Sequence, residues 1–548
     1  MKPSLRGCSR RSFVQGVTAV AVFGSLPAHV LAARDRPGEL SGTDFNLEIA
    51  NLPVNYTGRA SRATAVNGQV PAPLLRMREG DTVTIRVTNR LSEPTSVHWH
   101  GLLVPPDMDG VPGLSYAGIA PGETFIYRFT VQQTGTYWYH AHSLHEQTGL
   151  FGAIVVEPRT LSSALPERDY VVLLSDWTDE APLQVFLNLK KMGSYYNYAL
   201  PTTSDFIADV SRLGVTGAFA KRDKWNQTRM NPTDYGDISA ATYTYLMNGT
   251  TPADNWTCIA RAGERVRLRF VGAGAGTYFD VRIPGLKLRI VATDGQEVDP
   301  VEVDEFRIGP GETYDAIVQL PEDRAYTIFA QSIDRTGFAR GTLAPRLGMH
   351  ADVPTPDAPT WLSEADMMGS MAATANKVHH ARSEYGPSVD MRVDSPRDNL
   401  DDPGINLRGN GRRVLTYADL RTVGGALDTR EPGREIELHL TGNMNRFEWS
   451  FDGVKLNDAK PVHFRSGERL RVTLVNDTTM THPMHLHGMW CELESADKAF
   501  QVRKHTVTVQ PAQRVSFAVT ANAPGRWAFH CHLLYHMAAG MFREVVVA

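Results

Sequence analysis

The sequence predicts an all-β chain of three β-sandwich units, with a long irregular segment before the third. From about residue 41, short runs that alternate apolar and polar residues, such as 82–87, are bounded by Gly, Pro and Asn. A turn followed by such a strand occurs three times, at 79–87, 262–270 and 466–474. A second turn motif also recurs three times, at 121–125, 310–314 and 511–515. Each copy therefore has the size of an ordinary domain.

The first element in order is an N-terminal export signal at residues 1–33. Arg10 and Arg11 precede an apolar run over 16–26 and the small residues Ala32 and Ala33, which resembles a twin-arginine signal peptide. The run is too short to span a membrane as a mature helix, and we expect no stable membrane insertion elsewhere. We therefore expect export by the twin-arginine machinery to the periplasm of a Gram-negative bacterium, or outside the cell.

Composition narrows the class of function. Removal of residues 1–33 moves the formal charge from −4 to −8, with 52 basic residues against 60 acidic ones. A mildly acidic chain argues against nucleic-acid binding. The four cysteines are too few for a disulfide scaffold, and Cys8 leaves with the signal. Cys258 and Cys491 either pair in an oxidising compartment or remain separate buried thiols.

The units follow one another with one interruption. We place the first unit at 41–160, the second at 165–345 and the third at 411–548. Between them, 346–410 is rich in Pro, Asp and Ser and loses periodicity, as expected of a linker. This linker contains Met349, His350, Met367, Met368, Met371, His379, His380 and Met391. Its thioethers either bind Cu(I), which soft sulfur ligands suit, or are incidental.

Four His-x-His pairs stand at matching positions of the first and third units. Counted from the two repeated motifs, they are His98 and His100, His140 and His142, His485 and His487, and His530 and His532. Side chains two residues apart on a strand share a face, so each pair presents both rings together. The matching positions of the middle unit are Val281, Ile283, Phe329 and Gln331, so we expect that unit to act as a spacer.

The stretch near the C-terminus carries a different set of ligands. If 530–532 is extended, Cys531 points away from His530 and His532. A thiolate with two imidazoles and a weak thioether makes a blue-copper electron-transfer site, and the candidates are His482, Cys531, His536 and Met541. The first unit has Thr95, Ala141 and Leu150 at three of these positions, so we interpret its remaining histidine, His145, as a non-ligand.

The eight paired histidines predict a second centre, between the first and third units. Eight imidazoles can hold three copper ions and leave positions open for oxygen. Cys531 is bonded in the chain to His530 and to His532, which gives electrons a path from the single copper to this cluster. Four one-electron steps would reduce O2 to two waters.

These motifs resemble those of the multicopper oxidases. The resemblance implies three cupredoxin-like Greek-key β-sandwich domains and four copper ions: one type 1, one type 2 and a type 3 pair. It assigns His98 and His485 to type 2, and His482, Cys531, His536 and Met541 to type 1. The type 3 ligands would be His100, His140, His142, His487, His530 and His532.

Segments 101–113, 174–180, 229–234 and 528–537 resemble the bacterial copper-resistance protein A type. That resemblance implies periplasmic copper tolerance, with oxidation of Cu(I) and often of phenols.

Several residues near the motifs have two interpretations each. Asp109, nine residues after His100, is our candidate proton donor for O2 reduction; otherwise it is a turn residue before Gly110. Methionines near the type 1 ligands either guide Cu(I) or pack as apolar side chains; they are Met480, Met484, Met489 and Met537. Glu492 and Glu494 could bind a cationic substrate.

The leading prediction is a periplasmic multicopper oxidase that oxidises Cu(I), and phenols, with O2 as acceptor. One alternative is a laccase with mainly organic phenol substrates. Another is a copper-sequestering protein without catalysis. We expect a monomer, because three domains that enclose their own cluster need no second chain.

Overall fold

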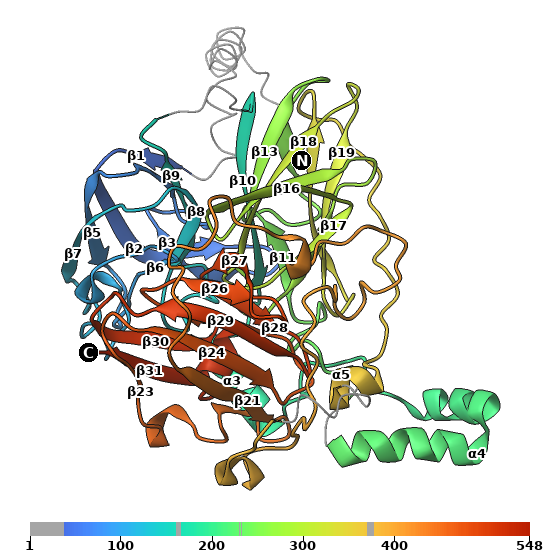
Figure 1. The fold of residues 1–548 in the computed structure, drawn as a ribbon. Helices are drawn as coiled ribbons and strands as arrows, with labels where there is room; N and C mark the ends of the chain where they lie inside the picture. Colours follow the sequence, from blue (N-terminus) through green and yellow to red (C-terminus); the bar gives the residue numbers. More distant parts are fainter. Residues whose placement is uncertain (1–37, 161–165, 229–230, 232, 370–377) are drawn as a thin grey trace, which may run out of the picture.

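The computed structural model describes residues 38–160, 166–228, 231, 233–369 and 378–548. The described chain is mostly β-strand, in six sheets, which confirms the all-β prediction (Figure 1). The predicted signal peptide, residues 1–33, lies outside the described residues. Among the described helices, none is long and apolar enough to cross a membrane.

The first pair of sheets uses strands from the blue end of the chain. One sheet has the order β1-β4-β9-β8-β6 and the other β3-β2-β5-β7. The strands are β1 (Glu39–Ser41), β2 (Asp44–Val54), β3 (Ser61–Val66), β4 (Leu74–Arg78), β5 (Thr82–Asn89), β6 (His98–His100), β7 (Thr124–Thr130), β8 (Gly135–His140) and β9 (Phe151–Glu157). A short 3-10 helix, η1 (Pro106–Met108), follows β6.

The second pair has the orders β11-β10-β13-β18-β15-β16 and β12-β20-β19-β14-β17. Its strands are β10 (Arg168–Trp177), β11 (Thr244–Met247), β12 (Trp256–Ile259), β13 (Arg265–Gly272), β14 (Phe279–Arg282), β15 (Leu288–Thr293), β16 (Gln296–Val303), β17 (Glu305–Ile308), β18 (Thr313–Gln319), β19 (Tyr326–Ser332) and β20 (Phe338–Ala344).

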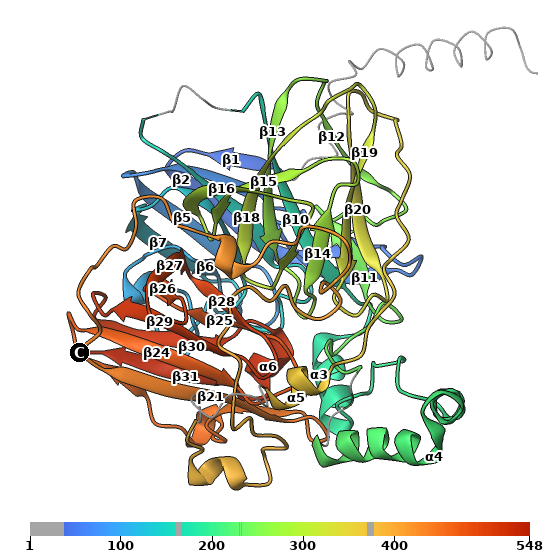
Figure 2. The ribbon, with the colours of Figure 1, turned by 45° about the vertical axis from the view of Figure 1, so that its right-hand side comes forward.

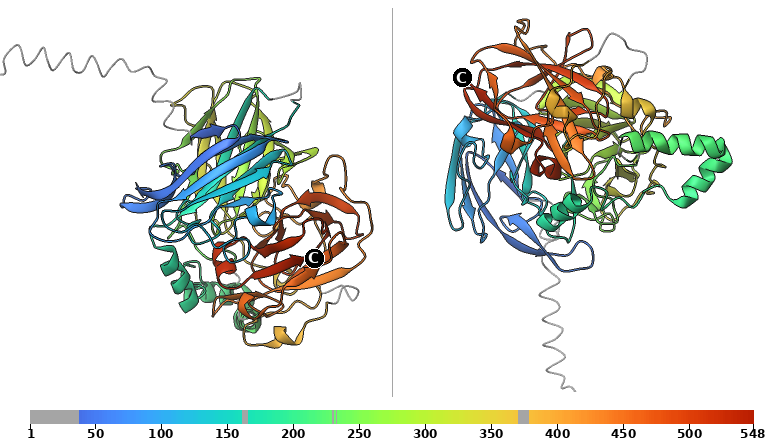
Figure 3. Two further views of the ribbon diagram at one scale, coloured as in Figure 1. Left: turned by 90° about the vertical axis from the view of Figure 1, so that its left-hand side faces the viewer. Right: turned by 90° about the horizontal axis from the view of Figure 1, so that it is seen from below.

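The third pair has the orders β22-β21-β24-β29-β26-β27 and β23-β31-β30-β25-β28. Its strands are β21 (Glu435–Asn443), β22 (Glu448–Phe451), β23 (Val462–Phe464), β24 (Arg469–Asn476), β25 (His482–Leu486), β26 (Cys491–Glu494), β27 (Phe500–Lys504), β28 (Thr506–Val509), β29 (Arg514–Thr520), β30 (Gly525–Cys531) and β31 (Phe542–Val547). Helix α6 (Leu534–Ala538) lies between the last two strands. This third unit lies against both of the others (Figure 3).

The two repeated sequence motifs become neighbouring strands in every unit. The first motif leads into β5, β13 and β24, and the second leads into β7, β18 and β29. These strands pair antiparallel as β5 with β7, β13 with β18, and β24 with β29. On β5, Val83, Ile85 and Val87 are buried while the alternate residues are not, as a strand with one apolar face requires. The repeated motifs therefore correspond to the same strand pairing in all three units.

The middle-unit residues that we predicted to be equivalent to the paired histidines are wrong by one position. In the first unit His98 lies opposite His140, and in the third His485 lies opposite His530. Counting from the motifs would place Val281 opposite Phe329, but Phe329 pairs with Arg282. A count along the chain cannot detect a one-residue difference in loop length. The conclusion is unchanged, because β14 contains no histidine.

Two helical insertions were not predicted from the sequence. They are α3 (Pro182–Lys191) and α4 (Thr203–Thr228), both in the second unit. Gly214, with φ of 72°, breaks α4 into two parts that project from the body of the molecule (Figures 1 and 2). The repeated motifs do not indicate these helices, because the first and third units have no counterpart to them.

The segment 346–410 has little regular structure but is packed against the core. Its described part holds α5 (Glu364–Met368) and the 3-10 helix η2 (Arg382–Tyr385). Met367 and Met391 are buried in the hydrophobic core, which favours packing over copper capture for these two. Met368 is 47% exposed, and Met371 lies outside the described residues.

Candidate metal centres

The eight paired histidines converge where the first unit meets the third. β6 and β8 supply one half and the ends of β25 and β30 the other. Nitrogens of the rings form three groups, two of which share His100, and all ligand atoms in a group lie within 4.8 Å of one another. The groups are His98, His100 and His485; His100, His140 and His532; and His142, His487 and His530.

Distances within two of these groups match ligation of one ion each. His532 Nε2 lies 3.2 Å from His100 Nδ1 and 3.3 Å from His140 Nε2. His530 Nε2 lies 3.2 Å from His142 Nε2 and 3.1 Å from His487 Nε2. Nitrogens bound at about 2.0 Å to one ion in tetrahedral directions are about 3.3 Å apart. The two groups therefore have the size of two metal sites.

A further group brings together three of the predicted type 1 ligands. Cys531 Sγ lies 3.6 Å from His482 Nδ1 and 3.8 Å from His536 Nδ1, and these nitrogens are 3.2 Å apart. Met541 is fully buried; its amide donates to the carbonyl of His536, and its own carbonyl accepts from the amide of Cys531. This main-chain position places Met541 beside the group.

The chain joins the centres through three consecutive residues. Cys531 ends β30 and faces His482 and His536, while His530 and His532 belong to two different histidine groups. The alternation of side chains along an extended strand produces this division. The Cys531 side chain is thus joined to each half of the cluster through a single peptide linkage.

Two buried carboxylates hold the far sides of the cluster rings. Asp109 Oδ2 accepts from Nδ1 of His487 at 2.8 Å, and its main-chain carbonyl accepts from Nδ1 of His98 at 2.7 Å. Glu146, which the sequence analysis missed, lies 2.8 Å from Nδ1 of His140. These contacts fix the tautomer that presents the other nitrogen to a metal. Asp109 also ends η1, so it is both a turn residue and a contact of two candidate ligands.

The single-cysteine group has outer contacts of its own, and one comes from the middle unit. Thr478 Oγ1 lies 2.7 Å from Nε2 of His482. Asp237 Oδ2, in the loop before β11, lies 3.0 Å from Nε2 of His536. Gly311 packs so closely that a Cβ there would come within 2.9 Å of His532. The middle unit is therefore more than a spacer, and the prediction was wrong in that respect.

Burial favours the neutral, metal-binding form of eight of the candidate histidines. Burial lowers the pKa of His482 and of seven cluster histidines, and repulsion from other histidine rings adds to the effect for all eight; the seven are His100, His140, His142, His485, His487, His530 and His532. For His530 the pKa falls to about 4. Burial raises the pKa of Cys531, so a metal must displace its proton on binding.

Two of the ring nitrogens lack hydrogen-bond partners, as expected of metal ligands. Nε2 of His98 and Nε2 of His485 are buried and have no hydrogen-bond partner within the described part of the chain. Buried polar atoms in proteins nearly always have a partner, so two unpaired ring nitrogens here are consistent with binding of a metal ion. A pocket lined by both residues, and by His505, adjoins them. His505 was not singled out from the sequence; its carbonyl accepts from Nδ1 of His485 at 2.7 Å.

Other sequence interpretations have clear outcomes. His145 contacts Thr95 and Glu93 and belongs to none of the four groups described above. Cys258 and Cys491 are separate buried thiols in the structure.

Three of the four methionines near the type 1 ligands are buried, and so are both glutamates proposed for a cationic substrate. Met480, Met484 and Met489 pack in the core. Glu492 pairs with Arg469 and Glu494 with Arg471, so the proposed cation site there is wrong.

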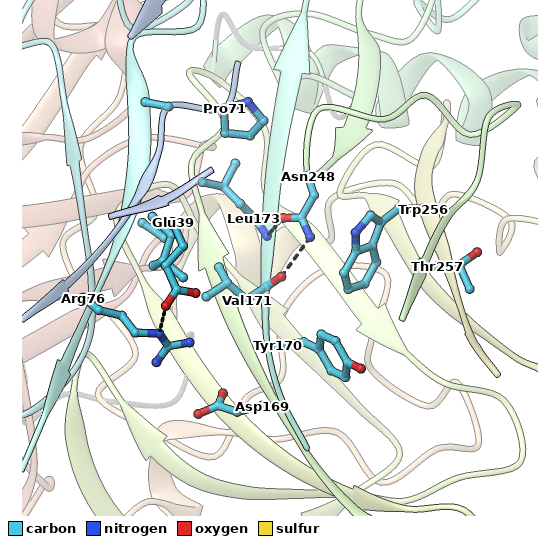
Figure 4. A pocket seen from close by; sticks show the side chains of 13 residues that line it. Glu39, Pro71, Arg76, Asp169, Tyr170, Val171, Leu173, Asn248, Trp256 and Thr257 are labelled. Carbon is cyan, nitrogen blue, oxygen red and sulfur yellow. Dashed lines mark hydrogen bonds and ion pairs between the residues drawn. The ribbon is translucent and has the colours of Figure 1, made fainter. Parts of the chain in front are cut away.

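A larger pocket lies away from the histidines. It is lined by 13 residues between the first and second units, including Arg76, Tyr170 and Trp256 (Figure 4). None of the candidate ligands is among them. We assign it no part in the copper chemistry.

Comparison with known proteins decides the family. Three multicopper oxidase family models match residues 48–161, 168–345 and 429–548. The chain belongs to the multicopper oxidases. The oxidase is 51% identical to a copper resistance protein A homolog of Pseudomonas syringae pv. tomato, over 98% of this chain and 99% of that relative. It is 49% identical to copper resistance protein A of Escherichia coli, with the same coverage.

Solved structures support the fold of the oxidase. The crystal structure of Fet3p, a multicopper oxidase that functions in iron import, has a TM-score of 0.66 at 19% identity and covers 93% of this chain and 90% of its own. A multicopper oxidase from Pseudomonas thermotolerans has a TM-score of 0.61 at 22% identity and covers 93% and 100%. The cupredoxin-like architecture is thus shared, while the three family models show that the chain is an oxidoreductase.

Proposed function

We propose that this enzyme couples one-electron oxidation of Cu(I), and of phenols, to four-electron reduction of O2 to water in the periplasm, and that it serves copper tolerance. The balanced reaction for the metal substrate consumes four Cu(I) ions, one O2 and four protons, and gives four Cu(II) ions and two waters. The copper resistance proteins that share about half of its sequence support the biological role. The arginine pair Arg10-Arg11 supports export.

The observation that carries the proposal is the sharing of residues 530–532 among three ligand groups. When bound, the copper ions would supply one-electron transfer at Cys531 and O2 reduction at the histidine cluster. The chain's own part is to hold His482 and His536 beside Cys531 and to bury the rings away from solvent. A protein that only stored copper would not need the second centre.

Asp109 remains our proposed proton donor. Its support is position: it is buried and contacts His487 and His98, on the face of the rings opposite the cluster. The same contacts give it a positioning role. A proton-donor role predicts that Asp109→Asn shifts the pH dependence of O2 turnover with copper content unchanged. Loss of copper without such a shift would leave only the positioning role.

O2 uptake with Cu(I) tests the proposed function. We expect the copper-loaded enzyme to consume O2 when Cu(I) is added, and Cys531→Ser to abolish uptake. Cys491→Ser is the matched control, because Cys491 is a buried thiol of the same unit outside the ligand groups. A loaded protein that consumes no O2 with either Cu(I) or a phenol would be a copper-sequestering protein. Uptake with the phenol alone would make it a laccase with organic substrates.

A further inference from the structure

A second cluster of metal-ligating side chains lies in the third unit, outside the copper groups. It consists of His380, Glu384, His439 and Asp477, and all four are buried. His380 and Glu384 come from the segment before the third unit, with Glu384 in η2. His439 lies on β21, and Asp477 directly follows β24. Three separate stretches of chain therefore meet at this cluster.

The four ligand atoms face a common centre. His380 Nδ1 lies 2.7 Å from Glu384 Oε2, and His439 Nδ1 lies 2.7 Å from Asp477 Oδ2. The crossed distances are also short: 3.3 Å from His439 Nδ1 to Glu384 Oε2, and 3.6 Å from His380 Nδ1 to Asp477 Oδ2. Separate ion pairs would not bring both imidazoles to both carboxylates. Four atoms at these separations can bind one ion at about 2.0 to 2.2 Å after small shifts.

The outer nitrogens of both rings also face carboxylates. His439 Nε2 lies 3.4 Å from Glu437, and His380 Nε2 lies 3.4 Å from Asp394. A carboxylate that accepts from the outer nitrogen orients an imidazole toward a bound metal, as Glu437 does for His439, whereas Nε2 of His380 has no hydrogen-bond partner among the described residues. Asp394 is 85% exposed, so the cluster lies close to solvent on this side.

Charge balance points to a divalent cation. Two buried carboxylates need two positive charges, which either two ring protons or one divalent ion can supply. The pocket thus strongly favours positive charge at its centre.

We propose that His380, Glu384, His439 and Asp477 form a binding site for one divalent first-row transition-metal ion, Cu(II) or Zn(II), in addition to the four coppers of the family. Two imidazoles and two carboxylate oxygens suit these ions. The site contains no sulfur, which disfavours Cu(I), and two nitrogen ligands disfavour Mg²⁺ and Ca²⁺.

Such an ion would fasten the preceding segment to the third unit. Val393 already donates its amide to Asp477 Oδ1 at 2.7 Å, and Asp390 donates its amide to the carbonyl of Gly442. A bound ion would therefore add a further link between the third unit and a segment that these hydrogen bonds already hold against it. Because it uses none of the copper ligands, the proposal stands or falls independently of the oxidase function.

Metal titration of the copper-loaded, full chain tests the site. Zn(II) alone and Cu(II) alone are the probes, and anomalous scattering at each metal's absorption edge locates the ion. We expect one additional ion per chain, with nitrogen and oxygen ligands in its X-ray absorption spectrum. Loss of a group that merely hydrogen-bonds a metal ligand costs about 10- to 100-fold in metal affinity. Because His380 would bind the ion directly, His380→Ala should weaken binding of the additional ion by at least this factor. His379→Ala, an exposed neighbour, is the matched control and should bind normally.

Glu384→Gln provides a second variant, which keeps the side-chain shape and removes one anionic ligand. It should also lose the ion while the blue copper absorption persists. If the wild-type chain binds no ion at the cluster with either probe, the four residues are a protonated ion-pair network and the proposal is wrong. An ion that binds equally well to His380→Ala and to the wild type would also overturn it.

Discussion

Replacement of Lys504 by methionine tests how the second unit supports the histidine cluster. Lys504 ends β27 in the third unit, and its Nζ lies 3.1 Å from Asp294 and 3.1 Å from Glu312, both in the second unit. All three side chains are 0–2% exposed. Burial would lower the pKa of Lys504, but the two carboxylates raise it, so the group is charged. Methionine keeps the apolar length and removes the charge.

We expect Lys504→Met to lower the free energy of unfolding strongly, because both carboxylates stay buried without a cation beside them. Breaking a buried ion pair in this way costs about 3–5 kcal/mol of the free energy of unfolding. Asp294 Oδ2 also accepts the amides of His505 and Thr506, and the His505 carbonyl holds the ring of His485. We therefore expect weaker copper binding at the predicted type 2 ligands as well.

Urea denaturation of the copper-free chain measures the difference in free energy of unfolding. Lys498→Met is the matched control, since this lysine is 60% exposed and lies 3.9 Å from Glu435. A surface pair of this kind contributes about 0–1 kcal/mol. The double variant Lys504→Met/Asp294→Asn should recover part of the loss, because it removes one unpaired charge. If Lys504→Met costs no more than Lys498→Met, the buried triad does not support the interface.

Three further predictions concern single side chains. Asp109→Ala removes the acceptor of His487 Nδ1, so copper affinity of the cluster or O2 turnover should fall about 10- to 100-fold, while the blue absorption of the Cys531 centre persists. Thr478→Val removes the contact to Nε2 of His482; the imidazole becomes a poorer electron donor, and redox titration should show a higher type 1 potential at unchanged copper content. Burial would raise the pKa of Asp402, but Arg408 and Arg397 lower it to about 2, below the unfolded value of about 3.9. Asp402→Asn should therefore cost about 2 kcal/mol at neutral pH, and denaturation at several pH values should show this difference vanish as pH falls from about 4 to 2; a difference independent of pH would contradict it.

The sequence was sufficient to predict which histidines and cysteine the structure groups together, because these residues are local and repeated. His-x-His on a strand and Cys531 between His530 and His532 follow from alternation, and the repeated motifs placed β5 beside β7 in each unit. The all-β class was predicted for the same reason. Counting failed only where a loop length differed, at Val281 and Phe329.

The contacts behind the ligands could not be predicted in this way. Glu146, Asp237 and Thr478 touch ligand rings because separate segments fold together, and no periodicity marks them. The cluster around His439 depends on how the segment before the third unit docks, which its composition does not reveal. The missed helices α3 and α4 have no counterpart in the repeats.

The most direct test of the central claim is a crystal structure of the copper-loaded enzyme with an anomalous difference map at the copper edge. We predict one peak between His482, Cys531 and His536, and three peaks among the eight paired histidines. The electron density of the same crystal should place Met541 Sδ beside the single copper. Absence of copper among the eight histidines, with a fully loaded Cys531 site, would contradict the account, because the chain would then have no centre for O2 reduction.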